Sequence, residues 1–305
     1  METPALAIPA DLTTRPLAPG DEPAVTRVMA AQELADVGEV VIEEADIVAD
    51  WRRPSHDVSA RTIGVFDGDH LVGYAETSAH GRGDAAVDPA YRGRGIGTFL
   101  AHWMQDNARR HGSTVIGMPV PEGSPGDRLL TALGYRVRWT SWVLELPLGR
   151  AIQERPLPEG YAVRAAEPAE YPAVHTVIED AFLEWSQRDR ERYSDFVASV
   201  VERPGFEPWT LRVVTDPTGA VVGTVLVQLA GEEQQEGFVA RLAVRRDQRG
   251  QGLAQVLLVD AFAQARAHGA SRSTLSTDSR TGALSLYEKV GMEVTSVWVN
   301  RAIDL

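Results

Sequence analysis

The sequence contains no cysteine among its 305 residues. Disulfide bonds, thiolate metal sites and an acyl-enzyme thioester on cysteine are therefore excluded. The seven histidines are scattered along the chain. No histidine has a second histidine or a set of carboxylates at the close helical spacing that is typical of zinc sites. We expect no bound metal, and any group transfer must be direct or use another nucleophile.

Long apolar runs are also missing, since no stretch approaches the roughly 18 uninterrupted apolar residues of a membrane span. The first residues do not show a basic start followed by an apolar run, so we expect a cytoplasmic protein without a membrane partner. The formal net charge of -13 repels phosphate backbones, which argues against nucleic acid as a partner. An acidic protein suits a cationic small molecule better.

Two common phosphate-binding motifs are absent. The sequence has no Gly-x-x-x-x-Gly-Lys-Ser/Thr segment, and neither of its glycine-rich loops completes Gly-x-Gly-x-x-Gly. These absences exclude the usual nucleotide kinase and dinucleotide oxidoreductase classes.

The two halves of the chain repeat the same landmarks. Residues 91–97 (YRGRGIG) recur as residues 248–254 (QRGQGLA) with an offset of 157, and His111-Gly112 recurs as His268-Gly269 with the same offset. A chance match would not keep its register over that distance. The 44% apolar composition and the length allow two cores, so the repeat predicts two domains.

The boundary between the copies is predicted in a proline- and glycine-rich stretch near residue 150. Upstream landmarks at 23–25 and 172–174 differ by 149 residues, which predicts a longer hairpin in the second copy, through 231–237. The predicted domains are residues 1–148 and 149–305.

Within each copy, short Val/Leu/Ile runs alternate with segments of helical periodicity. Two such runs, 211–214 and 221–229, are separated by turn residues. Helical spacing begins after Gly95 and Gly252 and ends near Gly112 and Gly269. Each copy is therefore an α/β (α+β) unit.

Each glycine-rich loop lies between an apolar strand, 238–244 in the second copy, and the start of a helix. Free N–H groups at a helix N-terminus attract phosphate, and glycines let it approach closely. The arginines 241, 245, 246 and 249 predict a local basic spot for such an anion. A tight turn alone would explain a single loop, but two loops in register favour a pyrophosphate ligand.

These residues resemble the GNAT superfamily of N-acetyltransferases, whose acetyl-CoA motif is Arg/Gln-x-x-Gly-x-Gly/Ala between a strand and a helix. The resemblance covers essentially the whole chain as a tandem pair, and it implies two domains, each a mixed twisted sheet flanked by helices. It also implies that acetyl-CoA contacts the strand and the loop. In the second copy these residues are Leu242, Ala243, Val244, Arg249, Gly250, Gln251, Gly252, Leu253, Ala254 and Gln255. In the first copy they are Ala85, Ala86, Val87, Arg92, Gly93, Arg94, Gly95, Ile96, Gly97 and Thr98.

A second family element, Leu-Tyr-x-x-x-Gly-Phe, resembles residues 286–292 (LYEKVGM). The resemblance implies that Tyr287 lies near the CoA sulfur, where a phenol can donate to the departing thiolate. Packing in a helix is the alternative role for this tyrosine. The equivalent residue of the first copy is Leu130, so we expect that copy to be catalytically degenerate.

The sequence offers several candidates for the general base. Several relatives carry a glutamate where this chain has Phe238, and Glu236 is the candidate on the same strand face. Water or carboxylates near Phe182, namely Glu179, Asp180 and Glu184, remain open alternatives, as does a purely solvated role for Glu236.

The sequence thus predicts an enzyme that transfers an acetyl group from acetyl-CoA to the primary amine of a small molecule, with the second copy catalytic. The alternatives are a non-catalytic acyl-CoA sensor or scaffold and a protein N-acetyltransferase. The acceptor, the acyl-chain preference and the oligomeric state stay open.

Overall fold

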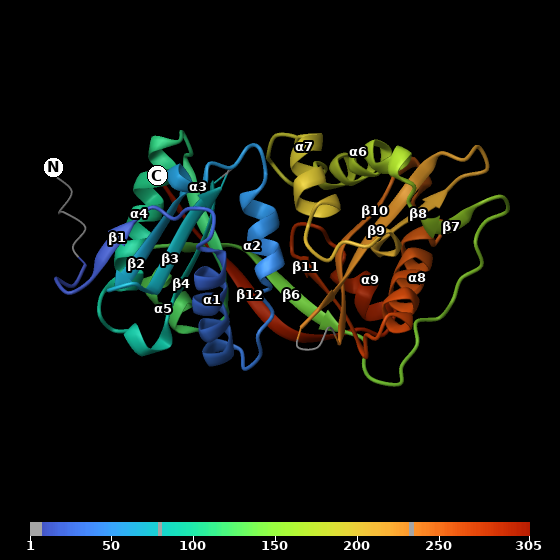
Figure 1. The fold of residues 1–305 in the computed structure, drawn as a ribbon. Helices are drawn as coiled ribbons and strands as arrows, with labels where there is room; N and C mark the ends of the chain where they lie inside the picture. Colours follow the sequence, from blue (N-terminus) through green and yellow to red (C-terminus); the bar gives the residue numbers. More distant parts are fainter. Residues whose placement is uncertain (1–7, 79–80, 232–234) are drawn as a thin grey trace. The chain divides into compact units, whose positions relative to one another are not determined.

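The computed structural model describes residues 8–78, 81–231 and 235–305, which form two compact units (Figure 1). Unit 1 takes the chain up to Thr140 together with Trp298–Leu305, and unit 2 is Ser141–Val297. Each unit is a mixed sheet with helices on both faces, as the sequence predicts. The predicted domain division after residue 148 stays a prediction, because unit 1 is not continuous in the sequence.

The sheet of unit 1 has the strand order β1-β2-β3-β4-β5-β12. Most neighbours are antiparallel, whereas β4 and β5 run parallel. The strands are β1 (Thr13–Arg15), β2 (Thr62–Asp67), β3 (His70–Ser78), β4 (Arg82–Val87), β5 (Val115–Pro121) and the last part of β12 (Glu293–Asp304).

The sheet of unit 2 has the corresponding order β6-β11-β10-β9-β8-β7, with β10 and β11 parallel. Its strands are the last part of β6 (Arg136–Glu145), β7 (Ala162–Ala165), β8 (Leu211–Thr215), β9 (Val221–Ala230), β10 (Glu236–Val244) and β11 (Arg272–Asp278). The predicted hairpin strands match β8 and β9. The extra hairpin length predicted for 231–237 falls partly outside the described residues.

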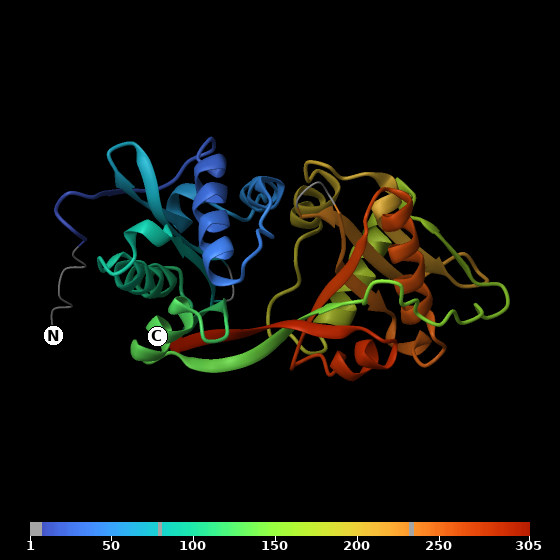
Figure 2. The same cartoon turned by 90° about the horizontal axis from the view of Figure 1, so that it is seen from below.

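Each unit completes its sheet with residues from the other sequence copy. In unit 1, Trp298–Asp304 pairs antiparallel with β5, and in unit 2 Ser141–Glu145 pairs antiparallel with β11. Figure 2 shows β12 as a long continuous strand. No signal in the sequence predicted this exchange, because alternating strands read the same whichever sheet they join.

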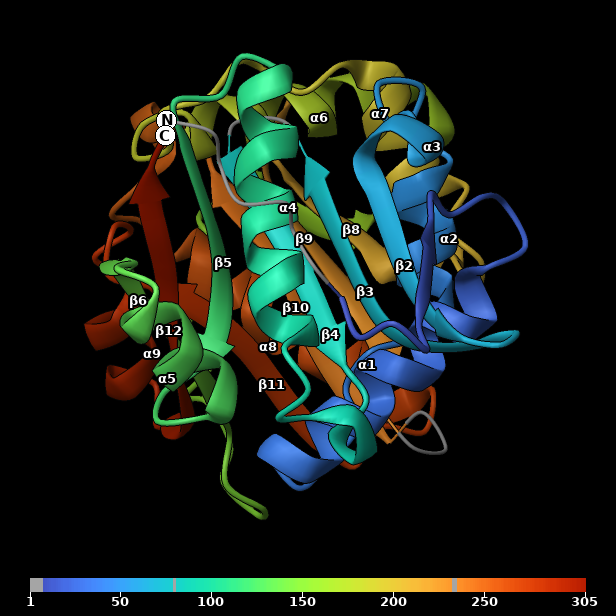
Figure 3. The ribbon, with the colours of Figure 1, turned by 90° about the vertical axis from the view of Figure 1, so that its left-hand side faces the viewer.

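Helices cover both faces of each sheet. In unit 1, α4 crosses one face and α1 packs on the opposite face (Figure 3). In unit 2, α8 covers one face, and α6 with α7 covers the other. The helices are α1 (Glu22–Asp36), α2 (Glu44–Trp51), α3 (Val58–Arg61), α4 (Ile96–Arg110), α5 (Pro125–Ala132), α6 (Tyr171–Phe182), α7 (Tyr193–Phe196), α8 (Leu253–Ala267) and α9 (Leu284–Lys289).

The predicted strand, glycine loop and helix are present in both units. Gly95 and Gly252 each occupy the N-cap position with a φ of +84° and +83°, and α4 and α8 follow directly. A side chain in this left-handed region meets its own backbone, which costs about 1–2 kcal/mol. Glycine is therefore required for the chain to turn from strand to helix at these two points.

We expect Gly252→Ala to lower the free energy of unfolding by about 1–2 kcal/mol, because alanine is strained at this φ. Denaturant titration followed by circular dichroism measures the loss. Gly252→Asn is the matched control and should lose less, since asparagine tolerates the left-handed region better. An alanine variant as stable as the wild type would contradict this account.

Candidate functional site

The side of β10 that faces β11 in unit 2 presents backbone N–H groups to a possible ligand. The Arg245 N–H donates to the Val222 oxygen of β9 at 2.8 Å, and antiparallel pairing alternates along the strand. The N–H groups of Leu242 and Val244 therefore point away from β9. Among the described residues, no side chain caps either of them.

The neighbouring strand leaves these groups accessible because β10 and β11 diverge. Their parallel pairing covers Glu236–Val239, although both strands continue beyond it. The divergence begins where Ala240 forms a β-bulge, since the register against β9 shifts between Val239 and Arg241. A bulge adds an unpaired residue and bends the strand. The result is a wedge lined by unpaired backbone N–H groups.

The start of α8 adjoins this wedge. The N-cap Gly252 supplies no side-chain cap for the first N–H groups of α8, those of Leu253, Ala254 and Gln255. Such groups carry a partial positive charge that favours an anion. A Cβ placed on Gly250 would meet no atom within 4 Å, whereas one on Gly252 would lie 3.0 Å from Arg155 Cδ. The loop is therefore open at Gly250 and has an arginine side chain beside Gly252. Leu253 is buried and can offer only its backbone.

Tyr287 lies on α9 and packs into the core beneath α8. Burial raises its pKa to about 12, so the phenol stays protonated at neutral pH. Among the described residues, no hydrogen bond engages its hydroxyl group. The ring is a core residue, which agrees with the packing role considered from the sequence. The role as a donor to the CoA sulfur stays a prediction.

Glu236 opens β10 on the sheet face opposite α8. Its carboxylate accepts a hydrogen bond from the Thr274 hydroxyl, and its Oε2 lies 4.0 Å from Arg272 Nη1. Phe238 lies two residues further and shares this face. Glu236 thus shares the face of Phe238, as the alternation predicted, and lies in the paired part of β10, three residues before the strands diverge.

Comparison with known proteins matches both sequence copies to one family. The model of the Acetyltransferase (GNAT) family matches residues 28–133 and 171–292. A mycothiol acetyltransferase of Salinispora arenicola is 32% identical over 82% of each chain, and that of Thermobispora bispora is 28% identical over 90% of this chain and 92% of its own. A GCN5-related N-acetyltransferase structure from Sphaerobacter thermophilus aligns with a TM-score of 0.73 at 25% identity, covering 98% of this chain and 97% of that one.

The chain belongs to the acetyltransferase (GNAT) family. It is an acyl-CoA-dependent N-acetyltransferase with two GNAT domains, and acetyl-CoA is its acyl donor. The two uncapped N–H groups and the glycine loop of unit 2 fit a ligand that carries both amide and phosphate groups.

The basic spot predicted beside the second GNAT loop is largely neutralised. Both terminal nitrogens of Arg249 lie 2.8 Å from the Glu184 carboxylate, and Arg245 pairs with Asp247 at 2.7 Å. These two arginines of the predicted basic spot therefore have carboxylate partners in the structure. A sequence shows which residues are charged, whereas pairing depends on which distant carboxylate reaches them.

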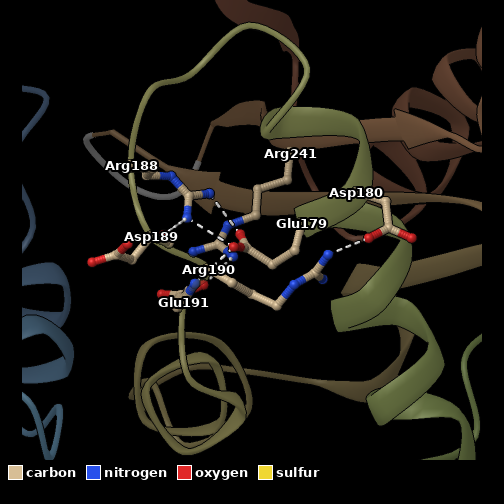
Figure 4. Close-up of polar contacts among 7 residues, drawn as sticks. All are labelled: Glu179, Asp180, Arg188, Asp189, Arg190, Glu191 and Arg241. Carbon is tan, nitrogen blue, oxygen red and sulfur yellow. Dashed lines mark hydrogen bonds and ion pairs between the residues drawn. The ribbon is translucent and has the colours of Figure 1, made fainter.

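The carboxylates near the end of α6 are engaged as well (Figure 4). Burial acts to raise the pKa of Glu179, but hydrogen bonds from Arg188 and from the Glu191 N–H outweigh it and lower that pKa. A carboxylate held in this way is a poor proton acceptor. The ion pairs at this helix end join Glu179 to Arg188, Asp180 to Arg190 and Glu191 to Arg241.

Unit 1 shows the same backbone with different capping. The Asp88 N–H donates to Val72 of β3, so the Ala85 and Val87 N–H groups point away from β3, like those of Leu242 and Val244 in unit 2. Here both groups have acceptors. The Ala85 N–H donates to the Asp84 carboxylate at 2.8 Å, and the Val87 N–H donates to Gln32 Oε1 at 2.9 Å.

The position of Tyr287 also has its counterpart in unit 1. The Tyr135 N–H donates to the Leu130 oxygen, as the Met292 N–H donates to the Tyr287 oxygen, so both helices end in the same Schellman motif. The alignment of Leu130 with Tyr287 is therefore structural as well as sequential. Leu130 is buried and has no group that can donate.

The remaining predicted residues of the first loop lie between β4 and α4. Arg92 binds Asp36 through two hydrogen bonds of 2.8 and 2.9 Å, and Arg94 pairs with Asp11. Ile96 is buried, and a Cβ on Gly97 would lie 2.8 Å from Leu129. Thr98 follows within α4, and Gly93 has a φ of +77° as Gly250 has +80°.

Sequence reasoning missed Asp84, a carboxylate on β4 directly opposite Glu76 of β3. Burial and the neighbouring Glu76 raise the pKa of Asp84 to about 6. Among the described residues, neither carboxylate forms an ion pair. The sequence of segment 82–87 does not predict that Asp84 faces Glu76, because the facing residue is known only once the strands are paired.

We expect Asp84→Asn to stabilise unit 1 at pH 7.5. The folded pKa of about 6 lies above the roughly 3.9 of an exposed aspartate, so ionisation destabilises the folded state as pH rises from about 4 to 6. Asparagine removes this effect, worth about 1–3 kcal/mol, and can still accept the Ala85 N–H. Denaturant titrations at pH 4.5 and 7.5 should show the gain only at pH 7.5.

The exposed Asp69→Asn is the control for this variant and should change stability little at either pH. A loss of stability in Asp84→Asn at pH 7.5 would show that the ionised carboxylate is favourable, contrary to our account.

Among the described residues, no group of three or more His, Cys, Asp or Glu side chains is arranged to hold a metal ion. In the same part of the chain, every helix is too short or too polar to cross a membrane.

Proposed function

We propose that unit 2 catalyses acetyl transfer from acetyl-CoA to the primary amine of a small molecule by direct attack on the thioester. The observation that carries this proposal is the pair of uncapped N–H groups, Leu242 and Val244, beside the N-terminus of α8. These groups suit the amide carbonyls of the pantetheine arm, and the N-terminus of α8 suits the pyrophosphate. Unit 1 lacks this combination, because its equivalent N–H groups, those of Ala85 and Val87, have side-chain acceptors.

Acetyl-CoA supplies the acyl group and a thiolate leaving group. In the proposed reaction Glu236 accepts the proton that the amine loses as the C–N bond forms. Tyr287 donates a hydrogen bond to the sulfur as the C–S bond breaks. A phenol with a pKa of about 12 holds its proton more tightly than a thiol of about 8.5, which favours hydrogen-bond donation over full proton transfer.

The names of the curated relatives support a small molecule as the acceptor. Relatives that match 82–90% of this chain are mycothiol acetyltransferases, which favours a small-molecule acceptor over the protein acceptor considered from the sequence. Proteomic mass spectrometry of peptides incubated with acetyl-CoA tests the protein alternative. Efficient peptide acetylation without small-amine turnover would reverse the assignment.

The first test of the proposal is calorimetric titration of the wild-type chain with acetyl-CoA. Binding is expected, with exchange protection of residues 236–256. Turnover is then followed as CoA release with a thiol reagent over a panel of primary amines. Because the chain has no cysteine, the reagent reports only released CoA. A chain that binds no acetyl-CoA would refute the proposal.

We expect Tyr287→Phe to lower kcat about 10²–10⁴-fold while the Kd for acetyl-CoA changes less than about threefold, because only the donor to the leaving sulfur is lost. Tyr135→Phe in unit 1 is the matched control. That phenol is also buried, but it bonds to Gln105 and to the Ala101 oxygen at 3.3 Å, so kcat should be unchanged. Equal activity of Tyr287→Phe and the wild type would remove Tyr287 from the mechanism.

We expect Glu236→Gln to lower kcat about 10²–10⁴-fold near neutral pH while the Kd for acetyl-CoA changes less than about threefold, because the proton acceptor is gone. Activity should recover partly at high pH, where more of the amine is already unprotonated. An unchanged kcat in Glu236→Gln would mean that water or another group accepts the proton.

A further inference from the structure

Helix α1 is bonded at two points to the segment of unit 1 that corresponds to the proposed acetyl-CoA site. Gln32 Oε1 accepts the Val87 N–H, and Asp36, one turn later, binds Arg92 of the glycine loop. The Asp36 side chain is only 6% exposed. Gln32 thus supplies to β4 the type of contact, a carbonyl oxygen on a strand N–H, that a pantetheine amide would make.

The equivalent helix of unit 2 lacks this acceptor. The offset of 149 that relates 23–25 to 172–174 also places the buried Val25 and Val28 on the buried Val174 and Val177. The same offset places Gln32 on Ala181, which lies on α6. Alanine has no oxygen in its side chain, and the Val244 N–H stays uncapped.

The arginine of each glycine loop is also held differently. Arg249 and Glu184 have side chains that are 43% and 34% exposed, whereas Arg92 binds a nearly buried Asp36. An exposed pair contributes little, so a ligand phosphate can displace Glu184 easily. The pair in unit 1 is harder to replace, because breaking it leaves a nearly buried carboxylate unpaired.

We propose that Gln32 blocks acyl-CoA binding in unit 1, and that the residue at this position of the first helix, Gln32 or Ala181, determines which unit binds the cofactor. This inference rests on the proposed function, because it takes the uncapped amides of β10 as the cofactor contact. It differs from the sequence-based expectation that residues 85–87 and 92–98 hold acetyl-CoA. Unit 1 then retains the GNAT backbone, but the Val87 N–H of β4 is occupied by the Gln32 side chain.

The experiment exchanges the two residues and titrates acetyl-CoA by calorimetry. The wild type should bind one equivalent, and Gln32→Ala should bind two, with new exchange protection of residues 82–98. Ala181→Gln should weaken binding at least tenfold, because the new amide can cap the Val244 N–H. The double exchange should return one equivalent, now protecting residues 82–98 instead of 236–256.

Two matched variants separate capping from packing. Gln32→Glu keeps an oxygen acceptor and should stay at one equivalent, whereas Gln32→Met keeps the length without the acceptor and should allow binding in unit 1. Ala181→Met adds similar bulk to unit 2 without an acceptor and should bind within about threefold of the wild type.

The outcomes distinguish this inference from the proposed function. Two equivalents in the wild type, or one equivalent in both Gln32→Ala and Gln32→Met, would overturn the role of Gln32 and leave the catalytic proposal intact. No binding by the wild type but one equivalent in Gln32→Ala would overturn the catalytic proposal and support the block. No binding by any variant would overturn both.

Discussion

Backbone N–H groups must find an acceptor, and this requirement shapes both halves of the molecule. Where β10 leaves β11 after Val239, the sheet can no longer supply acceptors on that side. In unit 1 the same divergence is met within the protein, by Gln32 for Val87 and by Asp84 for Ala85. One backbone arrangement therefore has two solutions, an internal cap and an uncapped edge suited to a ligand.

The two copies kept their backbone while their side chains diverged. The left-handed glycines at the helix starts and the Schellman motifs at Gly134 and Gly291 match closely, because only particular residues and bonds allow these turns. Tyr287 and Leu130 occupy the same motif position, yet only the tyrosine can donate. Backbone constraints thus preserve the motif, whereas the hydroxyl of Tyr287 has no counterpart at Leu130.

Local patterns predicted the parts of the site that depend on neighbours in sequence. The helix starts after Gly95 and Gly252, and the strands β8 and β9, follow from glycine chemistry and alternation. The contacts that distinguish the units were not predictable in this way. Gln32 caps a residue 55 positions away, and Asp84 faces Glu76 only because β3 and β4 pair in one register. The exchanged ends of β6 and β12 escaped prediction for the same reason.

The pairing of the loop arginines bears on how a phosphate is held in unit 2. Arg241, Arg245 and Arg249 each have a carboxylate partner, whereas the Arg155 side chain packs against the loop, where a Cβ built on Gly252 would lie 3.0 Å from Arg155 Cδ. A phosphate at this loop would therefore meet both the backbone dipoles at the start of α8 and the Arg155 side chain. The positive φ of Gly250 and Gly252 fixes the course of the loop that leads into α8, and with it the direction of these dipoles.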